Sequence, residues 1–314
     1  MSVWFVTGTD TGVGKTVVTA ALAAILRGRG RDVAVVKPAQ TGVRPGEAGD
    51  LDEVRRLAGP VDVREGARLP DPLSPDRAAL VAGVELPGLD DQAGLILRAA
   101  AGRDDVLVEG AGGVTVNLGR GFGLLEIADR VGRAGQPAAW IVVARAGLGT
   151  LNHSKLTVSA IRDRGFAVRG VVIGSWPAEP GPAERHNRDD DLAAHSGVPV
   201  LGAVPEGAAG LAPADFQARA AGWIALDLPV AGTTARSAEM SLSPAVAVSG
   251  AYDGLVADLV GDGGPQGRGQ VVAHAGVGHE PGAGDGAGGG PAALGPDDRV
   301  LLAVDDQGGD AQAG

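Results

Sequence analysis

The chain has 314 residues, a formal net charge of −11 and no cysteine. This length is enough for one large or two small domains with a substantial core. The acidic balance argues against a nucleic-acid or anionic-membrane surface, and the lack of cysteine removes disulfides, thiolate metal sites and cysteine nucleophiles. A strand is expected from Val3, and no apolar run is long enough to cross a bilayer. We therefore expect a cytoplasmic protein without a signal peptide or membrane span.

The first informative stretch is a glycine-rich turn between an expected strand and an expected helix. An apolar run at 3–6 precedes Gly8-Thr-Asp-Thr-Gly-Val-Gly-Lys-Thr16, and a run at helical spacing follows. Backbone N–H groups of such a loop, together with the positive end of its helix, cradle phosphate. Lys15 would reach the terminal phosphates, and the Thr16 hydroxyl would bind magnesium. Thr9 stands where the strict P-loop pattern has glycine, so we read the loop as one residue longer. The stretch predicts a nucleoside triphosphate site.

Polar residues follow the second expected strand, at 33–36. This strand leads into Lys37-Pro-Ala-Gln-Thr-Gly42, and the carboxyl ends of parallel strands face the crevice where such folds bind ligands. Taken alone, Lys37 is more typical of a solvated strand end than of a ligand-binding residue. Further on, Asp50 and Glu53 have the spacing of a capping box, which predicts Asp50 as a helix N-cap without excluding a role in metal binding.

A second carboxylate follows the buried strand expected at 105–108. Glu109 ends this strand and precedes Gly110-Ala-Gly-Gly113. In P-loop enzymes an acid in this position holds magnesium or its water shell, and small residues let the backbone approach the phosphates. A structural carboxylate in a strand-end turn is the alternative.

Strands and helices alternate regularly along the rest of the first 228 residues. We expect further strands at 138–144, 168–173 and 198–204, and helices at 91–101, 151–163, 183–195 and 213–224, with Ser74 and Pro75 starting another helix. This alternation predicts an α/β fold like that of P-loop NTPases, with a mostly parallel sheet and helices on both faces. From residue 229 the chain is rich in Gly and Ala, so we predict a P-loop domain at 1–228 and a disordered tail at 229–314.

Four stretches together resemble the dethiobiotin synthetase family. They are residues 6–16, 37–42, 108–113 and 147–153. The resemblance extends over residues 2–228, and the first stretch matches the family's own extended phosphate loop. It implies a ligase that carboxylates 7,8-diaminopelargonate with CO2 and closes the ureido ring through a carbamic–phosphoric anhydride. Mg-ATP is consumed, and ADP and phosphate are released.

The resemblance also implies roles for single residues. Lys37, Lys15 and Thr11 would be catalytic, and Thr16, Asp50 and Glu109 would bind Mg2+. The nucleotide would contact Thr9, Asp10, Thr11, Gly12, Val13, Gly14, Lys15, Thr16, Glu109, Gly110, Gly112, Gly174, Ser175, Val204, Pro205 and Glu206. The substrate would contact Lys37, Thr41, Gly110, Ala111, Gly149, Thr150, Leu151 and Asn152.

Members of the family bind their substrate at a homodimer interface. The resemblance implies that the substrate carboxylate is held by the helix start at 149–152 of the partner subunit. Free N–H groups at a helix start suit a carboxylate, so the expectation has a physical basis of its own.

One position departs from well-known members of the family. They have an asparagine that recognises the adenine edge, where this chain has Gly174. Because glycine offers no side chain, base choice would depend on backbone groups or on the loop at 204–207. We therefore expect a weaker preference for ATP over other triphosphates.

Two other functions share part of these sequence features. Partition-type ATPases share the sheet but carry a lysine near the start of the phosphate loop, where this chain has Thr9, Asp10 and Thr11. The synthetase half of a glutamine-dependent cobyrinate amidotransferase requires a cysteine nucleophile, and this chain has none.

Overall fold

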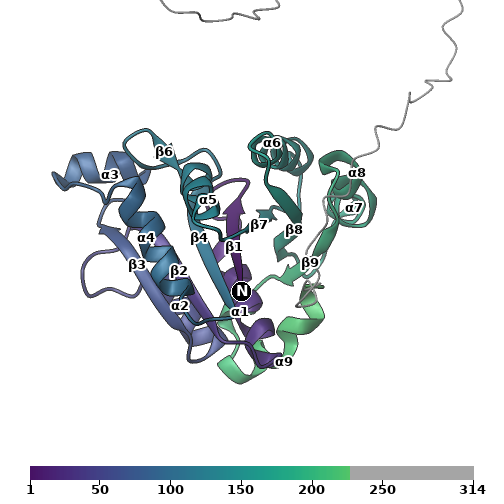
Figure 1. Cartoon of the computed structure of the whole chain (residues 1–314). Helices are drawn as coiled ribbons and strands as arrows, with labels where there is room; N and C mark the ends of the chain where they lie inside the picture. The colour runs from purple at the N-terminus through teal and green to yellow at the C-terminus, as the bar shows by residue number, and fades with distance from the viewer. Residues whose placement is uncertain (227–314) are drawn as a thin grey trace, which may run out of the picture. The chain divides into compact units, whose positions relative to one another are not determined.

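The computed structural model describes residues 1–226 (Figure 1). The prediction of a disordered tail at 229–314 falls outside these residues. Within residues 1–226, no helix is long and apolar enough to cross a membrane.

A parallel sheet of seven strands organises the described residues, in the order β3-β2-β4-β1-β7-β8-β9. Each neighbouring pair is parallel, which confirms the predicted sheet. A small antiparallel pair, β5 with β6, lies apart from it. The strands are β1 (Ser2–Gly8), β2 (Val33–Thr41), β3 (Asp62–Leu69), β4 (Asp105–Gly113), β5 (Asn117–Gly119), β6 (Phe122–Gly123), β7 (Ala138–Ala144), β8 (Ala167–Trp176) and β9 (Val200–Pro205).

Helices cover both faces of the sheet, as predicted (Figure 1). Alternate residues of β1 show the division, because successive side chains of a strand point to opposite faces. Val3 and Phe5 join a buried cluster with α4, α5 and α6, whereas Trp4 and Val6 join a second cluster with α1, α2 and α9. The helices are α1 (Lys15–Gly28), α2 (Asp50–Ala58), α3 (Pro75–Ala82), α4 (Leu89–Ala100), α5 (Leu124–Arg133), α6 (Thr150–Arg162), α7 (Pro182–His186), α8 (Leu192–Ser196) and α9 (Pro213–Trp223).

Strands β3, β5 and β6 and helix α5 were not predicted. Edge strand β3 has the sequence DVREGARL, with half-buried charged side chains in place of an apolar run; charge is typical of a sheet edge. Helix α5 carries apolar residues at helical spacing, such as Leu124, Ile127 and Val131, so its signal was present in the sequence. The single helix expected at 183–195 is instead α7 and α8 joined by a π-helical turn at Asn187–Asp191.

The expected cap of α2 was wrong by one residue. Gly49 is the N-cap, and its N–H donates to the Asp52 carboxylate at 2.8 Å. Asp50 is therefore the first helical residue. Its carboxylate is free of the capping role that the spacing to Glu53 suggested, and it points to Lys37 instead.

Truncation after residue 228 is expected to leave folding and turnover intact. The last described residues are anchored to the domain, because the Ala225 N–H donates to the Leu201 carbonyl and Arg29 donates to the Leu226 carbonyl, both at 2.8 Å. These contacts all survive the truncation. Thermal unfolding and a turnover assay of the shortened chain test the expectation. Loss of cooperative unfolding would show that the domain needs residues beyond 228.

Candidate active site

A pocket of about 580 Å³ opens where the carboxyl ends of β1, β2 and β4 meet. These three strands are neighbours in the sheet, and each contributes functional residues to the same edge. The loop after β1 supplies the glycine turn, β2 supplies Lys37 and β4 supplies Glu109. The pocket is lined by Thr11, Gly12, Gly14, Lys15, Thr16, Lys37, Ala39, Gln40, Thr41, Asp50, Pro72, Leu73, Ser74, Pro75, Glu109, Gly110, Ala111, Gly112 and Val116.

The glycine turn is held by close backbone packing. Gly14 has φ of 94°, a left-handed conformation that favours glycine. A Cβ on Gly14 would lie 2.6 Å from the Gly174 carbonyl oxygen, and one on Gly174 would collide with the Val13 carbonyl. The end of β8 therefore supports the phosphate loop directly. At Gly174 the backbone therefore has room for glycine only.

Lys37 links two carboxylates at the floor of the pocket. Its Nζ lies 2.6 Å from Asp50 Oδ2 and 2.8 Å from Glu109 Oε1, and the lysine side chain is only 3 % exposed. Burial disfavours the charged amine, but the carboxylates of Glu109 and Asp50 outweigh burial and raise the pKa of Lys37 above its usual value. Lys37 is therefore a fixed cation, and the structure excludes a solvated strand end.

Glu109 is fully buried and is shared by two donors. The Thr16 hydroxyl donates to its Oε1 at 2.9 Å, beside the Lys37 amine. Its second oxygen, Oε2, is buried without a hydrogen-bond partner among the described residues. An unpaired buried carboxylate oxygen is costly unless another group satisfies it. With the Thr16 hydroxyl and the Asp50 carboxylate nearby, this oxygen-only donor set suits a hard divalent cation such as Mg2+.

Lys15 stands inside the phosphate loop and is less firmly charged than Lys37. Its Nζ donates to the Asp10 carbonyl at 3.0 Å. Burial, reinforced by the nearby Lys37 ammonium and opposed by Glu109, lowers the pKa of Lys15 to about 8. An incoming triphosphate would favour the charged amine, so nucleotide binding and protonation of Lys15 are linked.

Metal-free ATP binding is therefore expected to weaken as the pH rises above about 8. The ammonium form dominates below that pH, and each further pH unit above it should raise the ATP dissociation constant by up to about tenfold. Binding measured in EDTA between about pH 6.5 and 9.5 tests this. In the matched variant Lys15→Arg the guanidinium stays charged, so its profile should be flat. A flat profile for the unaltered chain would contradict the linkage.

Asp10 shapes the loop from outside the pocket. Its carboxylate accepts the Thr11 N–H at 2.7 Å and pairs with Arg145, which follows β7. The preceding residue, Thr9, donates its N–H to the Val143 carbonyl at 2.9 Å. Both of these predicted nucleotide residues therefore fix the loop to strand β7.

The other predicted residues lie outside the lining of this pocket. Ser175, Val204, Pro205 and Glu206 are at the ends of β8 and β9, where the Glu206 N–H donates to the Trp176 carbonyl at 2.7 Å. Gly149, Thr150, Leu151 and Asn152 start α6. Thr150 is buried there and Asn152 is exposed. Within one chain, this helix start is not part of the site.

The sequence-based prediction missed Ala39, Gln40, Val116 and the loop at 72–75, which all line the pocket. Gln40 lies among the polar residues at the carboxyl end of β2, the position that singled out Lys37 and Thr41. The loop at 72–75 lines the pocket as well. Its prolines indicated a loop and a helix start, but nothing in the residues themselves pointed to a ligand.

The strand order, the glycine turn and the two charged strand ends define a P-loop nucleotide-binding protein. Residues 3–210 match the model of a family described as an AAA domain. An ATP-dependent dethiobiotin synthetase from Rhodococcus jostii is 54 % identical over 71 % of this chain and 94 % of its own length. The corresponding enzyme of Streptomyces avermitilis is 51 % identical over 72 % of this chain and 92 % of its own.

The chain belongs to the dethiobiotin synthetase family. This membership agrees with the four stretches that carried the resemblance and favours a synthetase over a partition-type ATPase. Among solved structures, a ParA family ATPase from Chlorobium tepidum is 14 % identical, with a TM-score of 0.44, over 69 % of this chain and 90 % of its own.

Proposed function

We propose that this chain is an ATP-dependent ligase that converts 7,8-diaminopelargonate and CO2 into dethiobiotin. One substrate nitrogen forms a carbamate with CO2, and a carbamate oxygen attacks the γ-phosphorus of ATP and releases ADP. The second amine then attacks the carbamate carbon, and phosphate leaves with the transferred oxygen as the ring closes. The observation that carries the proposal is Lys37, held between Asp50 and Glu109 on the floor of a pocket that the phosphate loop borders.

Lys15 and Lys37 would offset the electrostatic repulsion between the two reacting groups. The carbamate and the γ-phosphate are both anions, and two unit charges at about 4 Å repel by roughly 4 kcal/mol at an effective dielectric of 20. Lys15, protonated once the triphosphate is bound, would hold the phosphate, and Lys37 would hold the carbamate. Both ammonium groups would be in place before the reaction and need no reorganisation during it. Thr11 and Thr41 line the same pocket and would donate to the carbamate or accept from the diamine.

Thr16, Asp50 and Glu109 would hold Mg2+. Bound to the nucleotide, the ion would neutralise charge on the transferred phosphoryl group. The unpartnered Glu109 Oε2 and the oxygen-only donor set support this assignment. We also propose that base choice depends on backbone groups or on the loop at 204–207, since Gly174 has no side chain and lies against the phosphate loop.

We further propose a homodimer with the substrate site at its interface. In this arrangement the start of α6 in one subunit binds the substrate carboxylate of the other. Asn152→Ala is expected to raise the KM for 7,8-diaminopelargonate by about tenfold, the value of a hydrogen bond to a charged group, without changing dimer formation. Steady-state kinetics and sedimentation test this. An unchanged KM would place the carboxylate site elsewhere.

Labelled bicarbonate tests the proposed activity. Purified protein with Mg-ATP, 7,8-diaminopelargonate and ¹⁴C-bicarbonate should yield acid-stable label in an amount equal to the ADP released. Omitting the diamine should abolish both products. ATP hydrolysis that continues without the diamine and leaves no acid-stable label would contradict a synthetase and favour a partition-type ATPase.

A further inference from the structure

The Asp50 side chain is not held in place by burial, so other contacts must set its position. Asp50 is the first residue of α2, and its side chain is 37 % exposed, whereas Lys37 and Glu109 are almost fully buried. An exposed carboxylate at the end of a loop has many rotamers and a mobile backbone available to it. The 2.6 Å contact with Lys37 therefore depends on how the start of α2 is held.

Gln40 holds the start of α2. The first N–H groups of a helix have no partner within the helix, and the N–H of Asp50 donates to Gln40 Oε1 at 2.9 Å. The Gln40 amide is itself fixed, because the side chain is 3 % exposed and its Nε2 donates to the Thr41 carbonyl at 3.1 Å. Each end of this amide thus has one defined partner.

Strand β2 therefore contacts Asp50 at two points. Gln40 accepts a hydrogen bond from the Asp50 backbone N–H, and Lys37, three residues earlier on the same strand, forms an ion pair with the Asp50 carboxylate. Because both contacts come from one rigid element, they set the distance and direction of the Asp50 side chain relative to the pocket floor. A Cβ on Gly49 would lie only 3.0 Å from Gln40 Oε1, so glycine at the N-cap allows this close approach.

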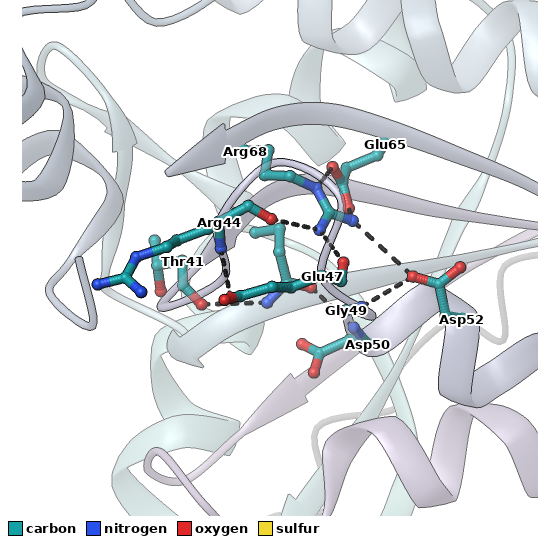
Figure 2. Close-up of polar contacts among 9 residues, drawn as sticks. Thr41, Arg44, Glu47, Gly49, Asp50, Asp52, Glu65 and Arg68 are labelled. Carbon is teal, nitrogen blue, oxygen red and sulfur yellow. Dashed lines mark hydrogen bonds and ion pairs between the residues drawn. The ribbon is translucent and has the colours of Figure 1, made fainter. Parts of the chain in front are cut away.

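Edge strand β3 also restrains the loop that leads into α2 (Figure 2). Arg68 of β3 forms a bidentate ion pair with Glu65, at 2.7 and 2.9 Å, and donates to the Glu47 carbonyl at 2.7 Å. Glu47 in turn accepts the Arg44 N–H at 2.9 Å. The loop at 42–49 that leads into α2 is thereby fastened to the sheet, and Gln40 acts on a segment that is already close to its final position.

We propose that Gln40 is a positioning residue for the metal site: it fixes the Asp50 carboxylate where a divalent cation bound to the nucleotide needs it. The inference rests on the proposed function, which makes Asp50 a magnesium ligand. Residues that orient metal ligands typically change metal affinity by about 10- to 100-fold when they are removed. The metal requirement, more than nucleotide binding, should therefore respond to Gln40.

The variant Gln40→Met keeps the side-chain length and removes both hydrogen bonds, whereas Gln40→Glu keeps an acceptor for the Asp50 N–H. The measurement is the Mn2+ concentration that half-saturates the complex of full-length protein with a non-hydrolysable ATP analogue, followed by EPR. Gln40→Met should raise this concentration about tenfold or more, and Gln40→Glu should restore it to near the unaltered value. In turnover assays the Gln40→Met variant should show a raised KM for Mg2+, with kcat recovering at saturating Mg2+.

Asp50→Asn separates the two possible failures. If Asp50→Asn leaves Mn2+ binding unchanged, the proposed metal role of Asp50 fails, and the inference fails with it. If Asp50→Asn weakens Mn2+ binding but Gln40→Met does not, the inference alone is overturned. Equal weakening in Gln40→Met and Gln40→Glu would also overturn it, because the retained acceptor should suffice. Should Gln40→Met not unfold cooperatively, Gln40→Asn, whose shorter amide cannot reach Asp50, is measured in its place with the same expected result.

Discussion

Lys37→Ala is expected to lower kcat by about a thousandfold while nucleotide binding stays measurable. This factor corresponds to the roughly 4 kcal/mol of repulsion between carbamate and γ-phosphate that the lysine would cancel. Lys37 is the buried cation that strand β2 supplies to the pocket, and its two carboxylate partners hold it in place. Steady-state kinetics with 7,8-diaminopelargonate, together with binding of a fluorescent ATP analogue, measure the two effects.

Lys15→Ala provides the comparison for this prediction. Lys15 belongs to the phosphate loop, so its loss should remove nucleotide binding as well as turnover. If Lys37→Ala loses nucleotide affinity to the same extent as Lys15→Ala, Lys37 serves the nucleotide and the carbamate role is wrong. An unchanged kcat in Lys37→Ala would contradict any catalytic role.

Glu109→Gln is expected to lower turnover by at least about a hundredfold and to raise the concentration of Mg2+ required. The substitution keeps the shape of the side chain but removes the charge that the Lys37 amine and the Thr16 hydroxyl share. Because Lys37 would keep only the half-exposed Asp50 as an ionic partner, we also expect the free energy of unfolding to fall by about 1–3 kcal/mol. Kinetics at varied Mg2+ and chemical denaturation measure these effects.

Asp105→Asn is the matched control for Glu109→Gln. Asp105 lies four residues earlier on the same strand, is equally buried, accepts the Trp4 indole N–H at 2.9 Å and pairs with Arg31. Its loss should therefore lower stability by a similar amount and leave the kinetics of the folded enzyme unchanged. A Glu109→Gln variant that loses stability but keeps full turnover and the same Mg2+ requirement would show that Glu109 is only a structural carboxylate.

The sequence predicted most of the site because the site is built from strand ends. The glycine turn, Lys37 and Glu109 each follow an apolar run, and parallel strands bring their carboxyl ends to one edge of the sheet. Each residue could therefore be placed at that edge without knowing the order of the strands. The structure supplied the order, with β4 between β1 and β2, and this order puts Glu109 next to both Lys37 and Thr16.

The parts that sequence reasoning missed depend on contacts between distant segments. The hydrogen bond from Asp50 to Gln40 exists because the loop at 42–49 folds back to the strand it left, and Arg68 of β3 holds that loop. Strand β3 itself has no apolar pattern from which it could be predicted. Local spacing therefore assigned Asp50 to a helix cap, whereas the folded chain gives that role to Gly49 and Asp52 and leaves Asp50 for Lys37.

Transfer of oxygen from the carbamate to phosphate tests the central claim most directly. When the reaction is started with ¹⁸O-labelled bicarbonate and stopped before the label exchanges with water, one labelled oxygen should appear in inorganic phosphate for each ring closed. That result follows if the ammonium groups of Lys15 and Lys37 bring the carbamate oxygen to the γ-phosphorus. Dethiobiotin formed together with unlabelled phosphate would contradict the account.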